Sequence, residues 1–240
     1  MLSIEQRKFL SPLITWRILD IENLIQLSKQ NRSYSSAQKL LKRLQQRQLI
    51  EIYRDPWNKK NYVFLGNLAI KELCPDTRPL LNSGALYHDS KVTSLGVELL
   101  KFNKIFKSIE LEHQIKKGKG IIGISDFIPD ARVEGQFKAK FFQAAVELEL
   151  HQKEKSRIVD KAKYYLESEY YNHALYFFPD NDLLQNYDTI IKKELGNDYN
   201  KKIFLFSCPL ISKAKPSFEN GTGLVMNKSK TFIEFFGGVY

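Results

Sequence analysis

The chain has 240 residues, of which 43% are hydrophobic, and it carries a formal net charge of +10. That apolar content can fill one large core or two small ones, whereas no apolar run approaches the length needed to cross a bilayer. The N-terminus lacks the apolar core of a signal peptide, so the sequence predicts a cytoplasmic protein with no membrane partner.

Positive charge is concentrated at the front of the chain. Residues 1–78 hold about 14 Lys and Arg against about 7 Asp and Glu, an excess that favours a polyanionic partner. Within this segment, apolar residues recur with helical spacing from Ile14 to Leu27. The pattern predicts either one helix or two helices, the second beginning at a turn within Asp20–Asn23.

The next predicted helix is amphipathic. Ser33 or Ser35 can cap its start. One face is an apolar stripe formed by Ala37, Leu40, Leu41 and Leu44. The other face carries residue types that bond to base edges and phosphates in a major groove, namely Ser36, Gln38, Lys39, Lys42, Arg43 and Gln46.

A basic hairpin is expected after this helix. LIEIYRD and NYVFLG have the composition of strands, and PWNKK between them has that of a turn. The basic residues near the tip are Arg54, Lys59 and Lys60. Helices followed by a capped helix and a basic hairpin resemble a winged helix-turn-helix, which implies binding of double-stranded DNA. A winged helix that contacts protein is the alternative.

The domain boundaries are predicted from where the helix and strand patterns stop. A short helix, NLAIKEL, ends the first domain before Cys74. We predict a first domain over residues 1–78, a linker over 79–86 and a second domain over 87–240. Cys74 and Cys208 lie far apart without metal-ligand spacing, so we expect two buried thiols.

The second domain begins with a helix that we expect Asp89 or Ser90 to cap. Three strands, a helix, a strand, a helix and a strand follow. This order predicts an α/β fold, α+β overall, with a mixed sheet flanked by helices. A turn or flexible loop is expected at KKGKG, residues 116–120, and a turn between two strands around Glu134 and Gly135.

Three carboxylates are expected to meet on this sheet. Glu147 and Glu149 share a face because side chains alternate along a strand, and Asp130 on the preceding strand pairs beside them. Without a cation the three would repel, and Mg²⁺ or Mn²⁺ would relieve that repulsion. Alternatively, the acids lie on an ordinary solvent-facing sheet surface.

The PD pair on one strand, followed by an acid on the next, resembles the PD-(D/E)xK nuclease superfamily, whose fold is that of restriction endonucleases. The resemblance implies that Asp130 and Glu147 hold the metal ion. Glu149 stands where that superfamily has a lysine, and a carboxylate cannot supply the positive charge that the reaction needs. Lys153, just beyond the strand, is the candidate replacement, with Lys155 as the other choice, so the implied catalytic set is Asp130, Glu147, Glu149 and Lys153.

The order of motifs resembles the replication-relaxation family of plasmids and conjugative elements. The motifs are the winged helix, HD at His88 and Asp89, PDA at Asp130, the VELEL strand and KAKYY, and they cover nearly the whole chain apart from its C-terminal tail. The family implies duplex DNA binding near a replication or transfer origin, with a relaxase or a replication protein as partner.

We therefore expect a double-stranded DNA-binding accessory protein of a plasmid or other mobile element, acting in replication or mobilisation. A magnesium-dependent endonuclease or nickase is one alternative, and a dimeric transcriptional repressor is another. The apolar tail after the NGTG turn forms a hairpin or an arm. It either covers the domain core or provides a homodimer interface.

Overall fold

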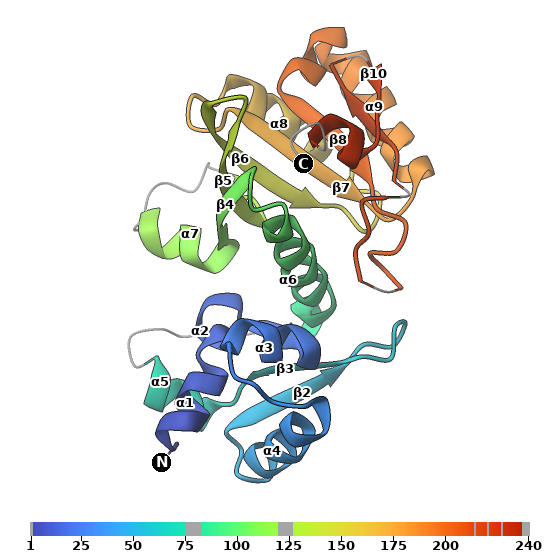
Figure 1. The fold of residues 1–240 in the computed structure, drawn as a ribbon. Helices are drawn as coiled ribbons and strands as arrows, with labels where there is room; N and C mark the ends of the chain where they lie inside the picture. Colours follow the sequence, from blue (N-terminus) through green and yellow to red (C-terminus); the bar gives the residue numbers. More distant parts are fainter. Residues whose placement is uncertain are drawn as a thin grey trace. The chain divides into compact units, whose positions relative to one another are not determined.

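The computed structural model describes residues 2–74, 83–119, 127–213, 215–219, 221–226 and 228–236. The chain divides into two compact units, Met1–Ser94 (unit 1) and Leu95–Tyr240 (unit 2), whose elements are drawn in Figure 1. Residues 79–82 of the predicted linker lie outside the described residues, and Ser83–Ala85 form a short 3-10 turn. No helix in the described part of the chain has both the length and the apolarity that a bilayer-spanning segment needs.

Unit 1 combines short helices with a small antiparallel sheet of strand order β1-β3-β2. Its elements are α1 (Ile4–Leu10), α2 (Pro12–Trp16), β1 (Ile18–Asp20), α3 (Ile21–Ser28), α4 (Tyr34–Gln46), β2 (Ile50–Arg54), β3 (Asn61–Leu65) and α5 (Asn67–Leu73). Leu24 of α3, Leu41 and Leu44 of α4 and Val63 of β3 are buried together in its core. Each such side chain contributes about 1.5–3 kcal/mol through burial.

The segment Ile14–Leu27 is two helices separated by β1, a strand that the helical spacing concealed. Asp20 ends β1 and caps α3, because its carboxylate accepts a hydrogen bond from the backbone N–H of Asn23 at 2.9 Å. The cap satisfies one of the unpaired donors at the helix start.

Helix α6 (Leu86–Lys101) contains the boundary between the two units. The predicted cap at Asp89 or Ser90 is wrong, because the helix begins earlier, at Leu86. Ser90 lies inside the helix, where its hydroxyl donates a hydrogen bond to the carbonyl of Tyr87 at 2.7 Å.

Unit 2 is a mixed α/β structure built on a seven-stranded sheet of order β10-β9-β8-β7-β6-β5-β4. Strands β6, β7 and β8 run parallel, and their neighbours pair antiparallel. The elements after α6 are β4 (Phe106–Leu111), α7 (Glu112–Lys119), β5 (Ala131–Phe137), β6 (Lys140–Leu148), α8 (Lys155–Glu167), β7 (His173–Phe178), α9 (Asn181–Leu195), a 3-10 turn (Asn197–Lys201), β8 (Ile203–Ser207), β9 (Gly223–Val225), β10 (Lys228–Ser229) and α10 (Phe232–Phe236).

Two predicted turns are wrong. The hairpin between β5 and β6 turns at Lys138 and Ala139, whose φ angles are 49° and 63°, and not at Glu134 and Gly135. Gly135 lies within β5, where a Cβ would come 2.3 Å from the carbonyl oxygen of Ile105, so the glycine permits close backbone approach. At KKGKG the chain continues α7 as far as Lys119, while Gly120 lies outside the described residues.

Helices α8 and α9 connect the parallel strands and pack on one face of the sheet (Figure 1). The other face receives α10, where Phe232 and Phe236 are buried and the Phe232 ring stacks on Phe218 with 4.3 Å between centroids. These tail residues therefore cover their own core, whereas Val239, Tyr240 and Asn220 of the NGTG turn lie outside the described residues. Cys74 and Cys208 are buried thiols, as predicted.

Candidate functional site

Helix α4 presents a basic and polar face to solvent. Its start is fixed by Ser33, whose hydroxyl accepts a hydrogen bond from the backbone N–H of Ser36 at 3.2 Å. Ala37, Leu41 and Leu44 face the core of unit 1. Because a helix advances 100° per residue, the exposed face then includes the predicted residues Ser36, Gln38, Lys39, Lys42, Arg43 and Gln46.

The basic charges of this face are not neutralised locally. Lys39, Lys42 and Arg43 form no ion pair with any other residue in the described part of the chain. Their long side chains end in solvent, where they can reach phosphate oxygens, and Gln38 beside them offers both a donor and an acceptor. The face therefore presents cationic and amide groups that make no ion pairs with other described residues.

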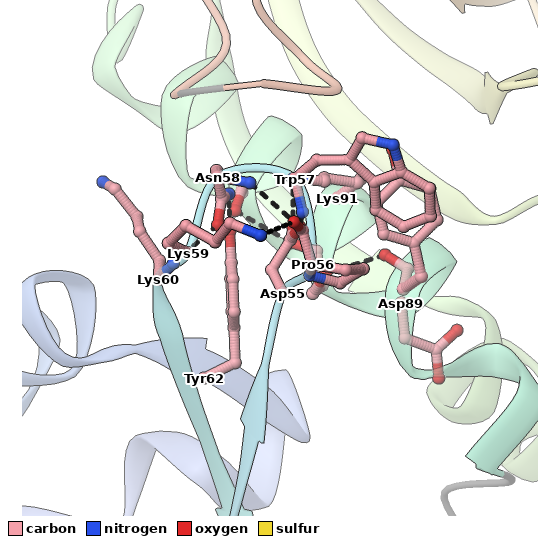
Figure 2. Close-up of polar contacts among 12 residues, drawn as sticks. Asp55, Pro56, Trp57, Asn58, Lys59, Lys60, Tyr62, Asp89 and Lys91 are labelled. Carbon is pink, nitrogen blue, oxygen red and sulfur yellow. Dashed lines mark hydrogen bonds and ion pairs between the residues drawn. The ribbon is translucent and has the colours of Figure 1, made fainter.

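The hairpin tip between β2 and β3 is organised by one buried carboxylate, that of Asp55 (Figure 2). Its Oδ1 accepts hydrogen bonds from the backbone N–H groups of Trp57 at 2.8 Å and Asn58 at 3.2 Å. The side chain of Asn58 then accepts from the N–H of Lys60 at 2.8 Å and donates to the Tyr62 hydroxyl at 3.1 Å. These bonds hold the six-residue tip in a single shape.

The second oxygen of Asp55 pairs with a lysine from the start of α6. Lys91 Nζ lies 2.6 Å from Asp55 Oδ2, and both side chains are 0% exposed (Figure 2). Burial lowers the pKa of Lys91, while Asp55 opposes that shift. A fully buried lysine is rare unless it is paired, so this ion pair fixes the hairpin tip to the first part of α6, which belongs to unit 1.

The side chains that the tip displays are aromatic and basic. The Trp57 ring is 59% exposed and packs on Tyr87 with 4.5 Å between centroids. Lys59 is exposed and bonds to the carbonyl of Pro56, whereas Lys60 Nζ lies 3.7 Å from Glu22. Arg54 is exposed at the end of β2. Lys59 and Arg54 thus remain available to an anionic partner, and Lys60 is partly neutralised.

The three predicted acids of unit 2, Asp130, Glu147 and Glu149 (the acidic cluster), lie close together. Ala131 pairs with Val146 across β5 and β6, so Asp130 comes beside Glu147, and its Oδ2 accepts the N–H of Leu148 at 2.8 Å. Glu147 and Glu149 are buried rather than solvent-facing, because their side of β6 is the side that α8 covers. The solvent-facing alternative is therefore wrong for these two glutamates.

Lys161 of α8 supplies the positive charge at this cluster. Its Nζ lies 2.6 Å from Glu147 Oε2 and 3.4 Å from Glu149 Oε1. The hydroxyl of Tyr165, one turn further along α8, donates a hydrogen bond to Glu147 Oε1. Both oxygens of Glu147 are therefore engaged by side chains of the same helix.

The pKa values follow from burial and from these neighbours. Burial raises the pKa of Glu147 to about 8, although Lys161 opposes the shift and Asp130 adds to it. Burial also lowers the pKa of Lys161, but the attraction of the acidic cluster outweighs that effect and raises it above its ordinary value. Burial therefore raises the pH at which Glu147 loses its proton above that of an ordinary glutamate, whereas Lys161 keeps its charge.

Neither Lys153 nor Lys155 forms an ion pair with the acidic cluster among the described residues. Lys155 begins α8 and pairs with Glu194 of α9, and Lys153 makes no ion pair with another described residue. The lysine that contacts these acids in the structure is Lys161.

The donor set does not fit a divalent metal ion. Glu147 is 0% exposed with both oxygens engaged, and one oxygen of Asp130 already accepts a backbone N–H. Within the described ranges, His, Cys, Asp and Glu side chains form no group of three or more able to hold a metal ion. A hard cation needs several free oxygen ligands, so Mg²⁺ and Mn²⁺ are not suited to the cluster as it stands.

Sequence analysis missed Lys161 and the Asp55–Lys91 pair. A signal existed for Lys161, because it lies among Ile158, Ala162 and Tyr165 on the inward face of α8, where an unpaired charge would be costly. Lys91 likewise precedes Val92 and Leu95 inside a core-facing helix. A lysine within an apolar stripe thus predicts a buried partner, although not which one.

Comparisons with models of protein families, with curated proteins and with solved structures find no match to this chain.

Proposed function

We propose that this protein binds double-stranded DNA through unit 1, with α4 in the major groove and the β2–β3 hairpin against the phosphate backbone. The observation that carries the proposal is the exposed face of α4, where Gln38, Lys39, Lys42 and Arg43 lie together without acidic partners among the described residues. Base edges and phosphates are the groups that these side chains recognise.

The order of elements in unit 1 supports a winged helix-turn-helix. Helix α3 precedes α4, and the basic hairpin follows it, as in that motif. In this assignment α4 is the recognition helix and the tip containing Trp57, Lys59 and Lys60 is the wing. The ordered bonds of Asp55 support a wing of defined shape.

In the same proposal, unit 2 has a PD-(D/E)xK-like core that serves as a second DNA-contacting surface or as a platform for a protein partner. Its mixed sheet and the adjacency of Asp130 to Glu147 support this assignment. With the motif order, they favour an accessory role in replication or mobilisation at an origin, as in the replication-relaxation family, with a relaxase or replication protein as partner. The nickase alternative gains no support, because the acidic cluster does not fit a metal ion.

The test is a titration of fluorescently labelled duplex, including origin fragments of the source element, with the Lys42→Ala/Arg43→Ala variant. We expect about a 10- to 100-fold loss of affinity and a salt-dependence slope that is smaller by roughly 1.8. The matched control is Lys192→Ala/Lys193→Ala, which removes the same charge from the exposed face of α9. Equal affinity for the wild type and the α4 variant would refute the proposal.

The hairpin provides a spectroscopic measurement of its own. Trp57 is 59% exposed, whereas Trp16 is only 6% exposed. DNA that approaches the hairpin should therefore change the fluorescence of Trp57 and leave that of Trp16 almost constant. We expect duplex to quench the wild type but not Trp57→Phe, and quenching that persists in Trp57→Phe would place the contact elsewhere.

A further inference from the structure

We infer that the ammonium group of Lys161 is the permanent counter-ion of the acidic cluster, and that it occupies the place a divalent metal ion would need. This concerns unit 2 alone and does not depend on DNA binding by unit 1.

The ammonium group of Lys161 lies between two carboxylates. Lys161 Nζ contacts oxygens of two different carboxylates, Glu147 at 2.6 Å and Glu149 at 3.4 Å. A cation shared by these two oxygens would lie in the same place. The ammonium is therefore located where a bridging metal ion would be, and the two would repel one another.

The contact between Lys161 and Glu147 is largely shielded from solvent. Glu147 is 0% exposed, and the side chain of Lys161 is nearly as well covered. Lys161 lies on the side of α8 that carries the buried residues Ile158, Ala162 and Tyr165, and its side chain is 12% exposed. An incoming metal ion would therefore have to displace an ammonium group that already contacts two carboxylates.

Two further hydrogen bonds engage carboxylates of the acidic cluster. The Tyr165 hydroxyl donates to the other oxygen of Glu147, and the Leu148 N–H donates to Asp130. These donors form hydrogen bonds with carboxylate oxygens that a metal ion would otherwise have to bind. The cluster is therefore satisfied internally, and its role is to join α8 to β6.

The experiment compares thermal unfolding with and without Mn²⁺, a probe whose free concentration can also be followed by its EPR signal. Four proteins are compared at pH 8: wild type, Lys161→Ala, Glu147→Gln and Lys161→Ala/Glu147→Gln. We expect Mn²⁺ to leave the midpoint of the wild-type unit 2 transition unchanged. Lys161→Ala should unfold roughly 10 °C lower without metal, and Mn²⁺ should raise its midpoint because the vacated place takes the ion.

The remaining variants assign the effect to the cluster. In Lys161→Ala/Glu147→Gln the response to Mn²⁺ should be lost, because one of the bridging carboxylates is gone. Mn²⁺ binding by the wild type that disappears in Glu147→Gln would overturn the inference, as would a Lys161→Ala protein that is as stable as wild type or indifferent to Mn²⁺. If Lys161→Ala is unfolded alone, refolding by Mn²⁺ supports the inference and failure to refold contradicts it.

Discussion

At the scale of single residues, the Asp55–Lys91 pair is the most consequential contact in unit 1. Removing one partner leaves the other charge buried without compensation, at a cost of about 3–5 kcal/mol. We expect Lys91→Met and Asp55→Asn each to lower the free energy of unfolding by that amount in a urea titration. The double variant should recover much of the loss, because neither charge then remains in the core.

A surface pair provides the control for that prediction. Lys101 Nζ lies 2.6 Å from Glu98, the same separation as in the buried pair, but the Lys101 side chain is 47% exposed. Lys101→Met should cost less than about 1 kcal/mol. Equal losses for Lys91→Met and Lys101→Met would show that burial does not set the strength of the Asp55–Lys91 pair.

The raised pKa of Glu147 gives a pH dependence with a definite sign. An acid whose pKa rises on folding binds more protons in the folded state, so its contribution to stability is complete below the ordinary pKa and is lost as pH rises through the folded value of about 8. Between pH 5 and 8, stability should fall by up to about 1.4 kcal/mol per pH unit from this group. The charged groups facing it are Lys161, Asp130 and Glu149.

Glu147→Gln is the variant that isolates this effect, because glutamine keeps the shape of the side chain and does not titrate. Urea titrations of both proteins from pH 5 to pH 8 should give a flatter profile for Glu147→Gln. Parallel profiles would mean that Glu147 has the same proton affinity in the folded and unfolded chains.

At the scale of elements, the turn between β5 and β6 stores strain. Lys138 and Ala139 both have positive φ, a geometry that two-residue hairpins prefer to build from Asn-Gly. Lys138→Asn/Ala139→Gly should therefore raise the free energy of unfolding by about 1 kcal/mol. Ala162→Gly in α8, where the φ is helical, is the opposite control and should lower it. A destabilised Asn-Gly variant would contradict the strain argument.

The same turn shows why some elements could be predicted and others could not. Hydrophobic periodicity was sufficient for α4, α8, α9, β7 and β8. It failed at the β5–β6 hairpin because glycine usually marks turns. Gly135 instead lies within a strand, where the carbonyl oxygen of Ile105 leaves no room for a Cβ. Lys138 and Ala139 are not turn formers, so their position followed only from the pairing of complete strands.

The candidate site was predictable to a similar extent. Alternation correctly put Glu147 and Glu149 on one face, and helical spacing correctly exposed Lys42 and Arg43. Which face α8 would cover is a tertiary property, so the burial of Glu147 and its pairing with Lys161 were not visible in the sequence. Lys153 is close to the acids along the chain, whereas Lys161 contacts them in the folded structure.

At the scale of the whole molecule, each unit has its own sheet and its own core. Separate cores unfold as separate cooperative transitions, and we expect differential scanning calorimetry to resolve two. Lys91→Met should shift one of them and Lys161→Ala the other. A single transition that both variants shift together would show that α6 makes the units unfold as one.

Helix α6 also restricts how such a chain can be recombined during evolution. Lys91 completes the core of unit 1, while Leu95 and Leu99 on the same helix are buried in unit 2. A gene fusion that replaced unit 2 would have to retain the coding sequence as far as Lys91, or the carboxylate of Asp55 would be left in an apolar interior. The junction at which unit 2 could be replaced therefore lies inside helix α6. A replacement domain would have to begin with a helix that continues α6 without a break.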